Sequence, residues 1–154
     1  MAANIYPIYT KTPNIGRVSI PTTNAQVKSN GVSAGSGTDV MYNIFTGGAD
    51  GSYIEKIRFF SVASAAATTG VATTLRAYLS TIATPSSGTT AADTFLVGEV
   101  SASAQSSSHS TNATNYIDMV LNMQVPSGSY IHISQHVAQT TNQNWNGIAM
   151  GGDY

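Results

Sequence analysis

The residues that could perform acid–base chemistry in this sequence are few and dispersed. Acid–base catalysis needs two titratable side chains that can converge on one substrate. The seven carboxylates occur singly and in no recognisable catalytic spacing, and they are Asp39, Asp50, Glu55, Asp93, Glu99, Asp118 and Asp153. The sequence contains no cysteine, which excludes thiolate chemistry. Its Gly-Val-Ser-Ala-Gly run at 31–35 lies in a predicted loop and lacks the strand-to-helix context that a serine nucleophile elbow requires. We therefore expect that the protein is not an enzyme and uses no cofactor.

Three histidines are the remaining candidates for metal ligands. His132 and His136 are four residues apart in a segment whose alternation of apolar and polar residues predicts a strand. They would share a face of that strand but lie about 13 Å apart at ~3.3 Å per residue. A single zinc ion needs its nitrogen ligands within about 2.0–2.1 Å. His109 lies in a serine-rich stretch with no partner motif. The spacing therefore favours no metal site.

Two arginines and the only tryptophan are candidates for contacts with another molecule. We expect Arg58 and Arg76 on the less apolar faces of two predicted strands, as near neighbours. There they could join Tyr78 and Phe60 in a cation–π cluster or a subunit contact, although a solvated strand face is the favoured interpretation. Trp145 combines a large apolar ring with a polar N–H, as side chains at interfaces and in sugar-binding clefts do. A position in the core is nevertheless favoured for it.

The composition limits the classes of partner. A net charge of −1 argues against nucleic acid or an anionic membrane held by simple electrostatics. Charged residues make up 8% of the chain, against about 25% in ordinary soluble domains. Such a surface offers little charge repulsion between copies, so it indicates a protein that works packed against itself or a partner. No run reaches the roughly 18–20 apolar residues of a membrane span, and no secretory signal is recognisable at the N-terminus.

Short runs of β-branched and aromatic residues separated by turn residues predict the elements. In residues 40–62 two such runs flank Gly-Gly-Ala-Asp-Gly, which predicts a β-hairpin. Within the second run Ile54 and Ile57 have opposite parity, which predicts a bulge near Glu55 and Lys56 if both isoleucines point inward. Residues 116–125 and 130–137 flank Pro-Ser-Gly-Ser and predict a second hairpin.

Further strands are predicted near residues 14–20, 71–80, 95–100 and 145–150, and the polar stretches 24–39 and 101–115 are predicted loops. About eight short strands without a convincing helix predict an all-β protein, a jelly-roll-like antiparallel β-sandwich. We expect one sandwich domain over residues 14–154, preceded by an extended arm over residues 1–13. Ile5, Tyr6, Ile8 and Tyr9 make the arm apolar. The favoured interpretation is that they cover an open end of the domain, and the alternative is that they lie on a neighbouring molecule.

Three segments resemble a known family. They are residues 4–16, the Phe-Thr-Gly-Gly-Ala-Asp-Gly-Ser run at 45–52 with Ile-Arg-Phe at 57–59, and the Gly-Gly-Asp-Tyr run at 151–154. These segments resemble small virion structural proteins of tailed phages and prophages, which are similar to head decoration (cement) proteins. Decoration proteins of this kind are small β-sandwich or jelly-roll domains that sit as trimers on the outside of the capsid. The shared motifs contain no catalytic residues.

The resemblance implies a protein of the virion, made in the host cytoplasm and located on the capsid surface. The implied partners are the major capsid protein and the protein itself, as a homotrimer, without nucleic acid or membrane. The candidate capsid or subunit contacts are Ile5, Tyr6, Ile8, Tyr9, Lys11, Arg58, Arg76 and Trp145. The alternative is a receptor- or carbohydrate-binding domain of a phage fibre, in which Trp145, Tyr78 or Tyr116 would stack on sugar rings.

Overall fold

The computed structural model of the chain describes residues 10–22, 40–65, 68–84, 93–108 and 116–154. These residues form strands and no helix, and hence no helix long and apolar enough to cross a membrane. The strands are β1 (Thr12–Ile20), β2 (Tyr42–Thr46), β3 (Ser52–Ala63), β4 (Thr68–Thr69), β5 (Thr73–Ser80), β6 (Thr94–Ala102), β7 (Ser106–Ser107), β8 (Tyr116–Val125), β9 (Tyr130–Gln135) and β10 (Gln143–Asp153). The predicted all-β class is confirmed.

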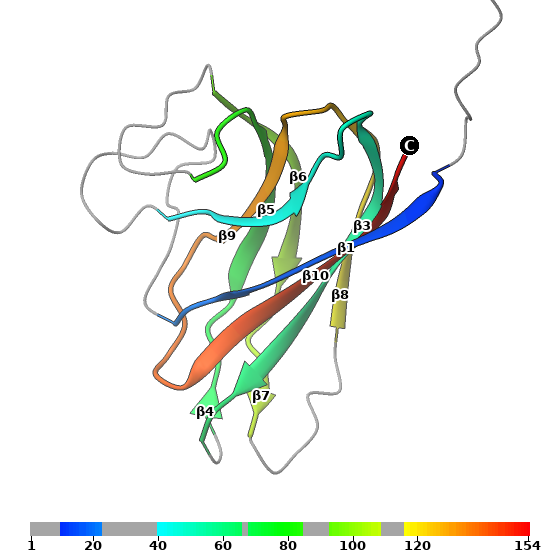
Figure 1. Cartoon of the computed structure of the whole chain (residues 1–154). Coiled ribbons are helices and arrows are strands. Elements are labelled where there is room, and N and C mark those ends of the chain that lie inside the picture. The colour runs from blue at the N-terminus through cyan, green and yellow to red at the C-terminus, as the bar shows by residue number, and fades with distance from the viewer. Residues whose placement is uncertain (1–9, 23–39, 66–67, 85–92, 109–115) are drawn as a thin grey trace, which may run out of the picture.

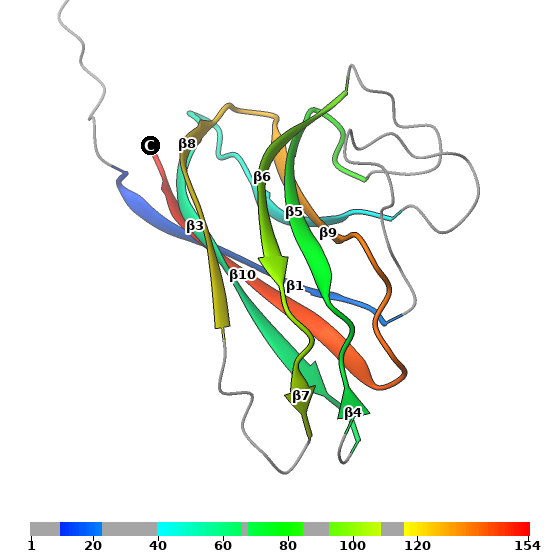
Figure 2. The ribbon, with the colours of Figure 1, turned by 180° about the vertical axis from the view of Figure 1, so that it is seen from behind.

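Eight of these strands form two antiparallel sheets that pack face to face (Figure 1 and Figure 2). Sheet A has the order β1-β10-β3-β8 and sheet B has the order β2-β9-β5-β6. The first and last strands of the chain are thus neighbours in one sheet, and consecutive strands mostly alternate between sheets. This is the connectivity of a jelly roll, in which two Greek keys build a double sheet. The short pair β4–β7 forms a separate two-stranded ladder beyond one end of β5 and β6.

The two predicted hairpins are wrong. β2 pairs with β9, whereas β3 pairs with β10 and β8, so the glycine-rich turn carries the chain from one sheet to the other. Residues 126–129 do the same between β8 and β9. The turns themselves form as expected, with φ of 87° at Gly51 and 72° at Gly128. A tight turn serves a hairpin and a sandwich corner equally well, so local turn chemistry does not separate the two.

The predicted bulge in β3 is confirmed. In the ladder between β3 and β10, Lys56 is opposite Met150 and Ile54 is opposite Gly151, so Glu55 is an extra residue in β3. The side chains of Ile54 and Ile57 are both fully buried. The ladder between β3 and β8 also shifts register here, with the extra residue on β8, where Asn122 has a φ of 46°. The extra residue in β3 turns both isoleucines to the inner face of sheet A, where burial of each contributes about 1.5–3 kcal/mol.

The core lies between the two inner faces. Phe59 and Trp145 from sheet A meet Leu75, Ile131 and Ile133 from sheet B, and all five are at most 1% exposed. At the edges the sheets approach each other closely, β1 against β2 and β6 against β8. β1 begins at Thr12, two residues earlier than predicted, and the Lys11 N–H already donates to the Asp153 carbonyl oxygen at 2.7 Å. Residues 1–9 of the predicted arm lie outside the described residues.

Candidate binding face

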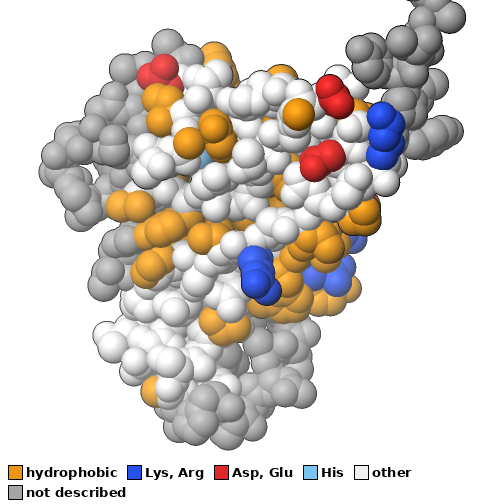
Figure 3. Space-filling view, in the orientation of Figure 1, with side chains coloured by type: hydrophobic (Ala, Val, Ile, Leu, Met, Phe, Trp, Pro, Cys, Tyr) orange, Lys and Arg blue, Asp and Glu red, His pale blue; other side chains and the backbone are white. Residues whose placement is uncertain are grey.

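The outer face of sheet A carries three rows of side chains that run across all four strands. The residue pairings set the rows as Ile15–Met150–Lys56–Val120, Arg17–Ile148–Arg58–Asp118 and Ser19–Asn146–Phe60–Tyr116. Large apolar side chains are unusually accessible here, with exposed fractions of 67% for Ile15, 63% for Val120 and 54% for Tyr116. Figure 3 shows Lys and Arg side chains beside a patch of hydrophobic side chains over these strands. We call the surface made by these three rows the sheet A face.

Arg58 is held rigidly at the middle of this face. Its Nε and Nη2 atoms donate to the two carboxylate oxygens of Asp118 at 2.6 and 2.7 Å. Its guanidinium carbon lies 3.8 Å from the centre of the Tyr116 ring, which in turn packs against Phe60 at 6.3 Å between ring centres. Lys56 approaches the same carboxylate at 3.3 Å. The paired planar geometry and the ring contact fix the guanidinium in one orientation.

The ion pair changes the titration of both partners. Hydrogen bonds from Arg58, with a further one from Lys56, lower the pKa of the Asp118 carboxyl from 3.8 to about 2. The hydrogen bond to Asp118 raises the pKa of Arg58. The carboxylate therefore stays ionised at any ordinary pH and cannot serve as a general acid, because a general acid needs a pKa near the working pH.

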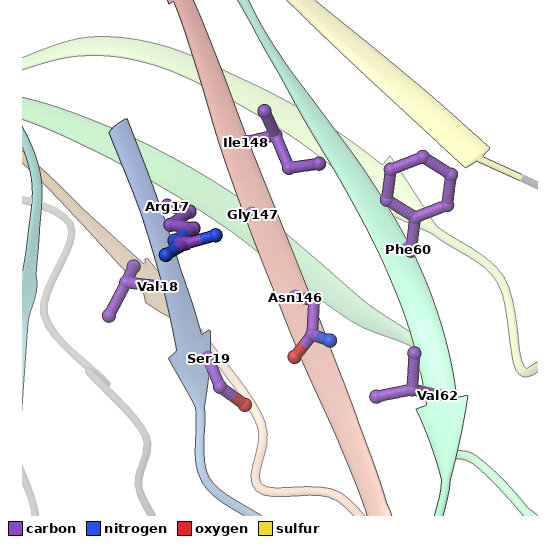
Figure 4. Close-up of a pocket in the computed structure, with 8 residues that line it drawn as sticks. All are labelled: Arg17, Val18, Ser19, Phe60, Val62, Asn146, Gly147 and Ile148. Atoms are coloured by element: carbon purple, nitrogen blue, oxygen red, sulfur yellow. The ribbon is translucent and has the colours of Figure 1, made fainter. Parts of the chain in front are cut away.

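A groove of about 410 Å³ opens beside Arg58 on the same face. Figure 4 shows β1 on one side of the groove and β3 on the other, with β10 between them. The residues that line it are Arg17, Val18, Ser19, Phe60, Val62, Asn146, Gly147 and Ile148. Its walls are largely apolar, and no carboxylate among the described residues forms an ion pair with Arg17. The groove thus offers an apolar lining with one unpaired cation.

The structure separates the two arginines that were predicted to be neighbours. Arg58 is on the sheet A face, whereas Arg76 is on β5, on the outer side of sheet B. Arg76 is 8% exposed, with Nε 3.3 Å from Glu99 Oε2 and Nη1 3.3 Å from His136 Nδ1. The suggested cluster of the two arginines does not form, because their strands lie in opposite sheets, and the favoured solvated face is not found at Arg76 either. Arg76 is a buried pairing residue and does not present a contact surface.

The outer side of sheet B is a buried polar layer around Arg76. Tyr78, His132 and Ser134 are all fully buried there, although their strands bury apolar side chains on the inner face as well. His132 Nε2 lies 2.7 Å from the Ile82 carbonyl oxygen. Burial lowers the pKa of His132, which favours the neutral ring, and burial raises the pKa of the Tyr78 hydroxyl. Burial, and not hydrogen bonding, therefore favours the uncharged forms of His132 and Tyr78.

Two of the three side chains predicted to stack on sugars are buried. Trp145 is 1% exposed and belongs to the core, as the favoured interpretation predicted, and Tyr78 is fully buried. Neither can meet a ligand at the surface of this domain, so both are corrected as contact residues. Tyr116 is accessible, but Arg58 covers one side of its ring. Of the other predicted contacts, Lys11 is exposed next to β1, and Ile5, Tyr6, Ile8 and Tyr9 lie outside the described residues.

The three segments that carry the family resemblance meet at Asp153. Asn14 Nδ2 donates to the Asp153 carboxylate at 2.7 Å, and the Ser52 hydroxyl donates to the same oxygen. The Gly48 N–H donates to Ser52 Oγ at 2.8 Å, and a Cβ at Gly48 would lie 2.8 Å from Asp153 Cγ. These contacts join β1, β10 and the turn before β3 at one end of the sandwich. The described residues of these segments therefore hold both ends of the domain and this turn together.

Sequence reasoning missed the most accessible members of the sheet A face. Ile15, Arg17 and Ser19 alternate with Gly16, Val18 and Ile20 along β1, and this alternation assigns the first three to one face. It does not say that the side with Ile15 faces outward, because isoleucine usually points inward. In the described residues, no group of three or more His, Cys, Asp or Glu side chains is placed to hold a metal ion.

Comparison with known proteins gives a likeness to solved structures. No protein-family model and no curated protein matches the chain. The fold is similar to a chain of the solved structure described as the cyanophage Pam1 capsid asymmetric unit, with 13% identity and a TM-score of 0.41. The alignment covers 98% of this chain and 90% of that chain. A likeness at this level carries no argument about function.

Proposed function

We propose that this protein is a head decoration (cement) protein of a tailed phage, a homotrimer that binds the outside of the capsid and stabilises it. The observation that carries the proposal is the sheet A face, an accessible apolar surface with fixed cations on a rigid jelly roll. Exposed apolar patches rimmed by polar residues mark sites of protein–protein contact. We propose in addition that the protein has no catalytic role. The resemblance of residues 4–16, 45–52 and 151–154 to virion proteins supports the proposed function as a whole.

The physical basis of cementing suits such a domain. A protein that binds only the assembled shell stabilises it by mass action. Icosahedral symmetry repeats every contact, and a trimer engages the shell at three points, so weak individual contacts add up through multivalency. With 8% charged residues, copies can approach closely with little repulsion. The proposal therefore includes three further statements. The protein is made in the host cytoplasm, it is located on the capsid surface, and its partner there is the major capsid protein.

The N-terminal arm is a second element of the proposal. Because β1 begins at Thr12 and the Lys11 N–H is bonded to Asp153, a truncation that tests the arm should remove residues 1–9 only. We expect this truncation to weaken capsid binding or trimerisation and to leave the unfolding temperature of the domain unchanged. Unaltered shell binding together with an unaltered oligomeric state would contradict a role for the arm.

The experiment that tests the function uses phage shells that lack this protein, from a deletion phage. Purified full chain is added to expanded shells, and bound copies are counted by gel densitometry after sedimentation. We expect hundreds of copies per shell and a higher temperature of shell disruption, as mass action requires. Unbound protein and an unchanged disruption temperature would contradict the proposal. Strong binding on a glycan array would instead support the fibre alternative.

A further inference from the structure

We propose that the sheet A face is the surface that meets the shell, and that it fits an apolar protein surface bearing carboxylates. This inference rests on the proposed function and names the binding face and the chemistry of its partner. The first argument is charge. Arg17, Lys56 and Arg58 lie on this face with one carboxylate, Asp118, and Glu55 approaches Lys56 at 3.9 Å from beside it. Cations therefore outnumber carboxylates here, within a chain of net charge −1.

The second argument is the position of the unpaired cation. Arg17 lies on the rim of the groove, opposite Phe60 and Val62, and no described carboxylate pairs with it. A partner that places an apolar side chain in the groove and a carboxylate beside Arg17 would satisfy both features. Arginine recognises a carboxylate by two parallel hydrogen bonds, which gives such a contact direction as well as attraction.

The third argument is preorganisation. Arg58 and Tyr116 are held against each other and against Asp118 before any partner binds. Tyrosine and arginine are enriched among residues that dominate binding energy at interfaces. Side chains that are already fixed lose little conformational entropy when the partner arrives. The centre of the face is therefore built for a contact, with Ile15 and Val120 as accessible apolar flanks.

A second copy docked through the same face fits less well. A two-fold contact places the same patch on both sides, so the cations of one copy would face the cations of the other. Like charges across an interface oppose association. The charge of the face thus favours a partner of opposite character, and the shell protein is the partner that the proposed function supplies.

The test compares two full-length variants on shells that lack the protein. The face variant combines Ile15→Ser, Arg17→Glu and Val120→Ser, three changes at exposed positions of sheet A. The control variant combines Phe95→Ser, Ser101→Glu and Ser103→Glu at exposed positions on and just after β6, and it lowers the net charge by the same amount. Unfolding temperatures of both variants are measured first, so that only folded protein is compared.

We expect the face variant to bind shells about 10-fold or more weakly, and the control to bind as the unaltered protein does. We also expect binding of the unaltered protein to weaken between about 50 and about 500 mM salt, because salt screens charge pairs at an interface rim. Failure of the unaltered protein to bind would overturn the proposed function. If the unaltered protein and the face variant bind shells equally well, only this inference is overturned and the proposed function stands. Loss of self-association in the face variant would also overturn it and assign the face to a second copy.

Discussion

Asp118 shows how one residue can be both a stabilising group and part of a candidate binding face. It accepts two hydrogen bonds from Arg58 and lies 3.3 Å from Lys56, while about a quarter of its side chain is exposed. Pairs this accessible are weakened by solvent and contribute about 0.2–1 kcal/mol. Its main effect on the sheet A face is therefore to orient Arg58, with a small addition to stability.

The lowered pKa of Asp118 makes that addition dependent on pH. The carboxyl titrates near 2 in the folded protein and near 3.8 ordinarily, so its contribution is complete above about pH 4 and is lost as the pH falls toward 2. We expect Asp118→Asn to lower the free energy of unfolding at neutral pH, by up to about 1 kcal/mol. The difference from the unaltered protein should shrink between pH 4 and pH 2.

Urea denaturation at a series of pH values measures this difference, and a double-mutant cycle with Arg58→Met isolates the pair. The coupling energy between the two residues should disappear over the same pH interval. Lys56→Met is the matched control, since Lys56 approaches the carboxylate at a longer distance and should couple more weakly. Curves for the unaltered protein and Asp118→Asn that stay parallel down to pH 2 would show that the ion pair does not stabilise the fold.

At the scale of elements, the seam between β1 and β2 closes one side of the sandwich. A Cβ at Gly16 would lie 1.5 Å from the Ile44 carbonyl oxygen, so the backbones touch where no side chain can be accommodated. At the opposite edge, a Cβ at Gly98 would meet the ends of Leu121 and Met119 at 2.8 and 2.9 Å. Flexible side chains can move aside, whereas the β2 backbone can do so only if β1 and β2 separate.

Gly16→Ala should therefore destabilise the protein much more than Gly98→Ala. We expect losses in the free energy of unfolding of about 3 kcal/mol or more for Gly16→Ala and about 1 kcal/mol for Gly98→Ala. Urea denaturation of the two variants gives both values, and limited proteolysis shows whether β1 detaches. Equal losses in the free energy of unfolding would contradict this expectation. They would mean that β1 and β2 can rearrange around an added methyl group as easily as the side chains between β6 and β8.

The elements also show what could be predicted from the sequence. The change of parity between Ile54 and Ile57 located the bulge, because it depends only on local periodicity. The partner of each strand depends on which inner faces meet in three dimensions. The sequence around the two turns therefore predicted hairpins where the chain crosses between sheets. For the same reason, local sequence patterns could not predict which residues surround Arg76 or that Ile15 is accessible to solvent.

At the scale of the whole molecule, cations outnumber carboxylates on the sheet A face although the chain has a net charge of −1. The sheet A face is positive, whereas Asp50, Asp93, Glu99 and Asp153 lie elsewhere in the described residues. A trimer that presents three copies of this face to the shell would hold them parallel, with subunit contacts made by other surfaces. This arrangement separates the two kinds of contact that the proposed function requires.

The homotrimer predicts an unfolding temperature that depends on protein concentration. If three chains dissociate as they unfold, a roughly hundred-fold increase in concentration should raise the temperature by about 5 °C. Differential scanning calorimetry over that range measures the shift, and sedimentation velocity gives the oligomeric state directly. The variant Ile15→Ser, Arg17→Glu, Val120→Ser should keep the same shift, because the face it alters points to the shell and away from the other subunits. A temperature that does not change with concentration would contradict the trimer. A shift lost only in that variant would mean that the sheet A face joins the subunits to one another.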